Sequence, residues 1–166
     1  MVAWLLRQID DDLAWAQEAS RRKAGGEAML EGVHWQWINP DNDTAAPLLP
    51  DTEEFVGAWD ENGVSLRSVE RWETENVPDW SDGLPQFALY HVDEVPVAVG
   101  GHIVRHDPAR VIRDLRARRR TVERCMDLRR YAAPGMALFA DSVLRDFADA
   151  YAERPGYLPE WEPRDN

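Results

Sequence analysis

Positive charge is concentrated in one short segment of an otherwise acidic chain. Residues 105–130 hold ten of the nineteen Lys and Arg residues and only four of the thirty-one acids, so this segment carries +6. The whole chain of 166 residues carries −12, which leaves −18 for the remainder. Like charges repel one another unless carboxylates or an outside anion lie between them. The segment must therefore fold against the protein's own acids or present its arginines to another molecule.

Composition places the chain among globular proteins with one core. Its 166 residues, of which 44% are hydrophobic, predict a single domain over residues 1–166. Cys125 is the only cysteine, which excludes an intrachain disulfide and a paired-cysteine zinc site. The sequence has no window of eighteen apolar residues and no signal-peptide pattern. We therefore expect a cytoplasmic protein that does not enter a membrane.

Hydrophobic spacing divides the chain into four parts. Residues 1–24 predict an amphipathic helix, and residues 32–95 predict short strands separated by turns and acidic loops. Residues 96–154 return to helical spacing, and residues 155–166 form a tail. The apolar positions of the first helix are Leu5, Ile9, Leu13 and Ala16, with Trp4 and Trp15 on an adjoining stripe.

A long helix is predicted to begin at Asp107 and Pro108. Aspartate caps the free N–H groups of a first turn, and proline is tolerated at the first helical position. One side of this helix is apolar and the opposite side is basic. The apolar side comprises Val111, Leu115, Val122 and Met126. The basic side comprises Arg110, Arg113, Arg116, Arg120 and Arg124.

Pro134 and Gly135 separate this helix from a last one. Helical spacing predicts that the last helix buries Met136, Phe139, Val143, Phe147 and Tyr151. Together the segments predict an α+β fold. In it, a small antiparallel sheet of three or four strands packs against the N-terminal helix and the two C-terminal helices.

Three stretches of the sequence resemble a known family. They are the opening helix Leu5–Asp12, the segment His102–Arg113 and a set of positions between Leu144 and Trp161. In these stretches the chain resembles a family from actinobacteria and their phages called domain of unknown function 6221. The resemblance implies a compact protein of bacterial or phage origin, and it implies no reaction because the family has no established activity.

Signatures of catalysis are scarce in the sequence. It contains neither a nucleophile elbow nor a glycine-rich phosphate loop. His102 and His106 are four residues apart, so they can share a helix face and bind a divalent cation if a third ligand is supplied. Ile103 stands where the zinc-protease signature requires glutamate. We expect neither an enzyme nor a bound cofactor, with a metal-dependent hydrolase at His102 and His106 as one alternative.

The arginine side of the long helix is the first candidate binding surface. Guanidinium groups suit bidentate contacts with carboxylates and phosphates. No aromatic residues alternate with these arginines for base stacking, which favours an acidic protein partner over nucleic acid. The predicted binding residues are Arg113, Arg116, Arg120 and Arg124. They indicate a non-catalytic accessory protein that binds a macromolecule, and a nucleic-acid-binding protein remains an alternative.

The acidic middle of the chain is the second candidate surface. Ten acids between residues 51 and 82 accompany Trp59, Trp72 and Trp80. Carboxylates next to aromatic side chains are able to engage a basic partner or to imitate DNA. An inhibitor that binds a basic protein through this surface is therefore a further alternative.

Overall fold

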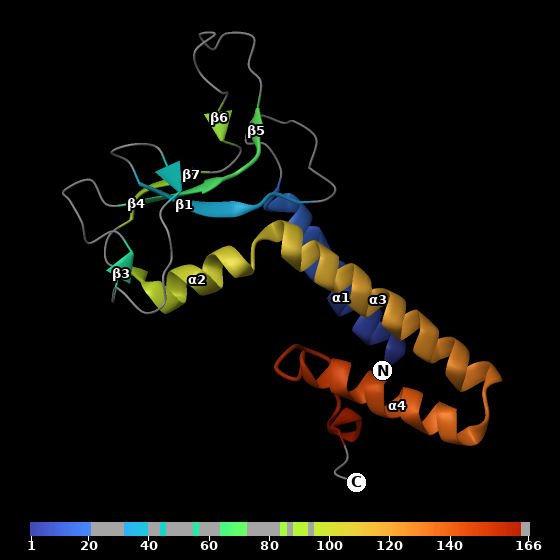
Figure 1. Ribbon diagram of the computed structural model, residues 1–166. Coiled ribbons are helices and arrows are strands. Elements are labelled where there is room, and N and C mark those ends of the chain that lie inside the picture. Colours follow the sequence, from blue (N-terminus) through green and yellow to red (C-terminus); the bar gives the residue numbers. More distant parts are fainter. Residues whose placement is uncertain are drawn as a thin grey trace. The chain divides into compact units, whose positions relative to one another are not determined.

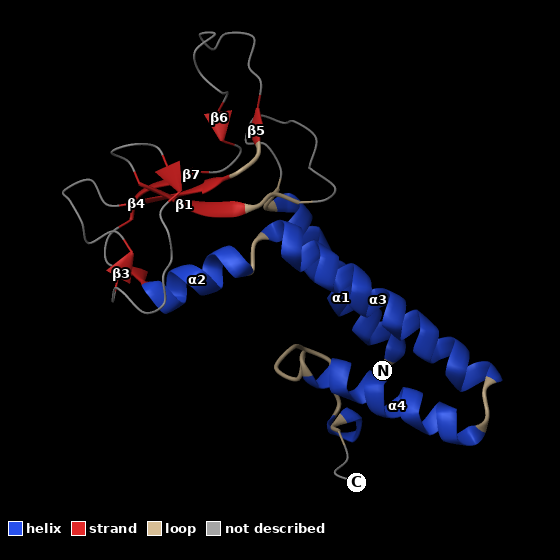
Figure 2. Cartoon of the chain, in the orientation of Figure 1, coloured by secondary structure: helices blue, strands red, loops and turns tan. Residues whose placement is uncertain are grey.

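A computed structural model describes residues 1–20, 32–39, 44–45, 55–56, 64–72, 84–85, 88–92 and 95–163. In chain order the helices are α1 (Val2–Glu18), α2 (Val97–Arg105), α3 (Pro108–Tyr131), α4 (Pro134–Asp149) and the short 3-10 helix η1 (Pro159–Trp161). The strands are β1 (Trp35–Asn39), β2 (Thr44–Ala45), β3 (Phe55–Val56), β4 (Val64–Ser68), β5 (Arg71–Trp72), β6 (Leu84–Pro85), β7 (Ala88–Val92) and β8 (Val95–Pro96). The predicted α+β class is confirmed (Figure 1, Figure 2).

The chain divides into two compact units. One comprises residues 1–15 and 113–166, and the other comprises residues 16–112. Helices α1 and α3 each contribute residues to both units. The single domain expected from the sequence stays a prediction.

An antiparallel sheet is the centre of the unit formed by residues 16–112. Its strand order is β2-β1-β4-β7, and β1 pairs with β4 so that Trp37 lies opposite Leu66. Two further strand pairs, β3 with β8 and β5 with β6, are also antiparallel. Trp37 is buried, and its Nε1 donates a 3.1 Å hydrogen bond to the carbonyl oxygen of Gly100 in α2. The sheet of three or four strands expected from the sequence is thus present, and within this unit α2 packs against it.

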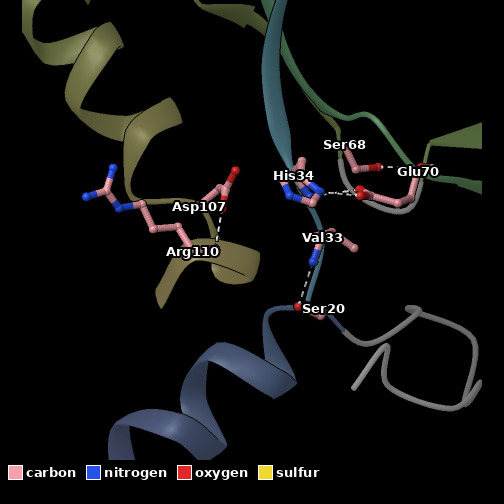
Figure 3. A network of polar contacts seen from close by, with 7 residues as sticks. All are labelled: Ser20, Val33, His34, Ser68, Glu70, Asp107 and Arg110. Carbon is pink, nitrogen blue, oxygen red and sulfur yellow. Dashed lines mark hydrogen bonds and ion pairs between the residues drawn. The ribbon is translucent and has the colours of Figure 1, made fainter. Parts of the chain in front are cut away.

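The chain that leads into β1 is fixed to the ends of two helices (Figure 3). Val33 N–H donates a 3.2 Å hydrogen bond to Ser20 Oγ, and the carbonyl oxygen of Val33 accepts one of 3.1 Å from Ala109 N–H. Gly32 has a φ of 81°, and a Cβ built there would lie 2.6 Å from the Ala109 nitrogen. Only glycine allows the backbone at residue 32 to lie this close to the backbone of Ala109. The contact fixes the first turn of α3 against the chain that leads into β1.

Helices α1, α3 and α4 form the other unit, with residues 151–163 continuing from α4. Each helix buries one stripe. The buried side chains are Trp4, Leu5 and Ile9 of α1, Leu115, Val122 and Cys125 of α3, and Ala140, Leu144 and Ala148 of α4, with Tyr151 after it. The C-terminal segment folds onto α1, because Trp4 lies against Tyr151, Tyr157 and Trp161.

The predicted apolar stripe of the last helix is wrong at Met136 and Phe139, which are exposed. Val143 and Phe147 are half-buried, and Tyr151 is buried as predicted. The buried residues within α4 are Ala140, Leu144 and Ala148. Hydrophobicity gives too little weight to small side chains such as those of Ala140 and Ala148. Met126 of α3 and Trp15 of α1, both predicted on apolar stripes, are also exposed.

Candidate functional site: the arginine face of helix α3

Helix α3 begins at Pro108, as the sequence predicts. Asp107 Oδ1 accepts a 2.7 Å hydrogen bond from the N–H of Arg110, which satisfies one free donor of the first turn (Figure 3). Asp107 is itself buried. Its carboxylate therefore caps the first turn of α3.

The exposed arginines of α3 lie opposite its buried side. At about 100° per residue, Arg113, Arg120 and Arg124 project within about 20° of one direction, which is also the direction of Tyr131. Leu115, Val122 and Cys125, which point the other way, are buried. The three arginines are exposed and Arg116, about 60° from this direction, is half-buried.

Other arginines of the helix pair with the unit's own carboxylates. Arg119 NH1 forms an ion pair with Asp10 of α1, and its Nε donates a 3.2 Å hydrogen bond to Glu123. Arg129 Nε lies 2.8 Å from Asp141 Oδ1 of α4. These pairs neutralise the basic helix where it meets its neighbours.

The predicted binding residues divide into two kinds. Arg113 and Arg116 each interact with other groups of the protein. Arg120 and Arg124 make no ion pair or hydrogen bond with other side chains in the described part of the chain, and both are exposed. Two guanidinium groups in one line on α3 are thus available to an anion from outside.

Helix α2 and the residue after it carry the two histidines of the alternative in which the protein is a metal-dependent hydrolase. The rings of His102 and His106 are stacked, with 4.1 Å between their centroids and 28° between their planes. His106 Nδ1 lies 2.9 Å from the carbonyl oxygen of His102. Among the described residues no group of three His, Cys, Asp or Glu side chains is able to hold a metal ion.

Of the three tryptophans of the second predicted surface, Trp72 alone lies in the described part of the chain. Trp59 and Trp80 lie outside the described residues. Trp72 ends β5, where it pairs with Leu84.

A histidine–carboxylate pair lies at the start of the sheet, in a region without a recognisable sequence motif. The backbone N–H of His34 donates to Glu70 Oε2 at 2.8 Å, and His34 Nδ1 lies 2.6 Å from Glu70 Oε1 (Figure 3). The Oγ of Ser68 donates a 2.9 Å hydrogen bond to the backbone oxygen of Glu70 and holds this turn. Local sequence spacing does not predict this pair, because 36 residues separate His34 from Glu70. The pairing of β1 with β4 brings the two residues together.

The model of a family of unknown function, DUF6221, matches residues 1–163. The chain belongs to that family. No curated protein and no solved structure matches it. The DUF6221 match also spans residues 39–95, where the three stretches of resemblance in the sequence leave a gap.

Two further observations concern the helices of this DUF6221 protein. None of the helices in its described part is long and apolar enough to cross a membrane. Large apolar side chains are exposed on α3 and α4, among them Tyr131, Leu138 and Phe139. Of these three, only Phe139 contradicts the apolar stripe that the sequence predicts for the last helix.

Proposed function

We propose that this protein is a non-catalytic cytoplasmic accessory protein, of bacterial or phage origin, that binds an acidic partner protein through α3. The surface that makes the contact is the arginine face, defined as Arg113, Arg116, Arg120 and Arg124. The observation that carries the proposal is the pair of exposed guanidinium groups at Arg120 and Arg124, which no described side chain neutralises.

The residues around the arginines favour a protein over nucleic acid. A net charge of −12 repels any anion at long range, phosphate and carboxylate alike, so the arginine face attracts a partner only at short distance. Tyr131 is the single aromatic residue in line with the arginines, so successive bases have no series of rings on which to stack. Arginine forks bind carboxylates bidentately, which suits short-range recognition of an acidic surface.

Fluorescence anisotropy with two labelled probes tests this function. One probe is a glutamate-rich peptide of about 16 residues, and the other is a single-stranded DNA of about 16 nucleotides. Arg120→Glu with Arg124→Glu should weaken peptide binding about tenfold or more, because each reversal replaces attraction by repulsion. Arg7→Glu with Arg105→Glu is the matched control, since it makes the same change in net charge on α1 and α2.

Two results count against the proposal. Equal losses of peptide binding in both double variants would mean that only net charge matters. Tighter binding of the DNA, lost with Arg120 and Arg124, would assign the face to nucleic acid. Selective loss of peptide binding in the Arg120 and Arg124 variant supports it.

A further inference from the structure

The exposed side of α2 carries two histidines four residues apart. His102 lies in the last turn of α2, His106 follows its last residue, and both are exposed. At about 100° per residue, His102 projects about 160° from Gly100, the buried residue whose carbonyl oxygen accepts the hydrogen bond from Trp37. His102 therefore points away from the sheet, and both rings are open to water.

The two imidazole rings form a pair before any ligand binds. Their centroids are 4.1 Å apart, and their planes are inclined by 28°. Two metal–imidazole bonds of about 2.1 Å each span up to about 4 Å, which matches the distance between the rings. Because the rings are already held together, little conformational freedom is lost when an ion joins them.

A backbone hydrogen bond fixes the protonation site of His106. Its Nδ1 lies 2.9 Å from the carbonyl oxygen of His102. A carbonyl oxygen only accepts hydrogen bonds, so Nδ1 of the neutral ring is the donor and Nε2 carries the lone pair. Histidines that bind metals commonly donate their other N–H to a carbonyl or carboxylate in this way, which orients the ring. His106 is therefore oriented as a ligand that binds through Nε2.

The ring of His102 has no competing partner among the described residues. Neither of its nitrogens makes a hydrogen bond or an ion pair in that part of the chain. His34 differs in this respect, because its Nδ1 lies against the carboxylate of Glu70. A lone pair of His102 is thus available beside that of His106.

We propose that His102 and His106 bind one divalent transition-metal ion of the kind that favours imidazole, namely Cu²⁺, Ni²⁺ or Zn²⁺. Two nitrogen ligands suit these ions and do not suit Ca²⁺ or Mg²⁺, which require oxygen ligands. No third His, Cys, Asp or Glu of the described residues joins the pair, so water completes the coordination and the ion exchanges readily. The bound ion ties the last turn of α2 to the residue that follows it and holds this end of the helix.

The metal site goes beyond the proposed function and shares no residue with the arginine face. His102 and His106 belong to α2 and the residue after it, whereas the arginine face belongs to α3. Replacing the histidines should therefore leave the binding of the glutamate-rich peptide unchanged in metal-free buffer. The two proposals fail independently of each other.

Isothermal titration calorimetry of the full chain, without an affinity tag, tests the site with NiCl₂ as the probe. We expect one Ni²⁺ ion per chain, and an excess of CaCl₂ should not displace it. His102→Ala and His106→Ala should each weaken Ni²⁺ binding about tenfold or more, because a single imidazole is left to hold the ion. His91→Ala is the matched control, since it removes a histidine of β7 and should leave the affinity unchanged. Circular dichroism verifies that each variant remains folded.

Nuclear magnetic resonance identifies the ligands independently. Substoichiometric Cu²⁺ is paramagnetic, so it should broaden the ring signals of His102 and His106 before those of other residues. A wild-type protein that binds no Ni²⁺, full affinity in His106→Ala, or an equal loss in His91→Ala would overturn the proposal. Broadening centred on carboxylates would assign the ion to the acidic surface and would overturn it as well.

Discussion

Trp4 Nε1 donates a 3.0 Å hydrogen bond to the carbonyl oxygen of Pro155, which lies 151 residues further along the chain. The indole is buried, and its centroid lies 5.2 Å from that of Trp161. Arg154 strengthens the same contact, because its NH2 lies 2.5 Å from Asp12 Oδ1. The first turn of α1 and the residues after α4 are thereby joined.

Replacing Trp4 tests this junction. Trp4→Ala removes a buried ring and a hydrogen bond, so the free energy of unfolding should fall by about 3–5 kcal/mol. Urea denaturation measures the change. Trp15→Ala is the control, since that ring is 76% exposed and its loss should change stability by about 0.5 kcal/mol or less. Equal losses in the two variants would contradict the junction.

Gly156 provides a second test of the same region. Its φ is 87°, and an added Cβ would lie 3.0 Å from Trp4 Nε1. Gly156→Ala should therefore destabilise the protein by about 1–2 kcal/mol, because it combines backbone strain with a close contact. Gly135→Ala is the matched control: an added Cβ in this helical position of α4 meets nothing within 4 Å. That variant should unfold at the same or a higher urea concentration.

The sequence predicts elements better than it predicts which side of an element is buried. Asp107 with Pro108 located the start of α3 because capping depends on neighbouring residues alone. Phe139 was expected in the core because it is large and apolar, yet Ala140, Leu144 and Ala148 are buried there instead. Which stripe is buried depends on how closely the facing helices approach, and that distance is a tertiary property.

The candidate site follows the same division. Helical spacing predicts that Arg113, Arg120 and Arg124 share one direction, since this requires only the period of the helix. Spacing does not predict that Arg119 pairs with Asp10 or Arg129 with Asp141, because the acids lie on other helices. Which arginines remain exposed and unpaired is therefore decided by the packing of the three helices.

The single thiol offers a measurement of core packing. Cys125 is 4% exposed, and burial raises the pKa of its thiol. Only the unfolded protein should react rapidly with a thiol reagent such as DTNB at pH 8, because folding removes both access and the thiolate. Since the unfolded thiol titrates near pH 8.5, unfolded chains lose this proton first as the pH rises. The thiol therefore contributes stability below about pH 8.5 that is lost at higher pH.

The variant Cys125→Ala separates the contribution of the thiol to alkaline destabilisation from the contributions of other titrating groups. Its free energy of unfolding should fall less steeply between about pH 8 and pH 10 than that of the wild type. Burial also raises the pKa of the Tyr151 phenol, so some alkaline loss remains in the variant. Rapid labelling of the folded wild-type protein would show that Cys125 is accessible.

The two contacts between His34 and Glu70 predict the tautomer of the imidazole ring. One carboxylate oxygen accepts from the backbone N–H of His34 at 2.8 Å, and the other lies 2.6 Å from Nδ1. A carboxylate only accepts hydrogen bonds, so the neutral ring should carry its proton on Nδ1. Nitrogen-15 chemical shifts of the ring measure this directly.

Glu70→Ala removes both acceptors, so it should lower the free energy of unfolding by about 1–2 kcal/mol and release the ring from the Nδ1–H tautomer. Glu70→Gln retains one acceptor oxygen, so its free energy of unfolding should lie between those of the wild type and Glu70→Ala. An Nε2–H ring in the wild type would show that Nδ1 does not donate to Glu70.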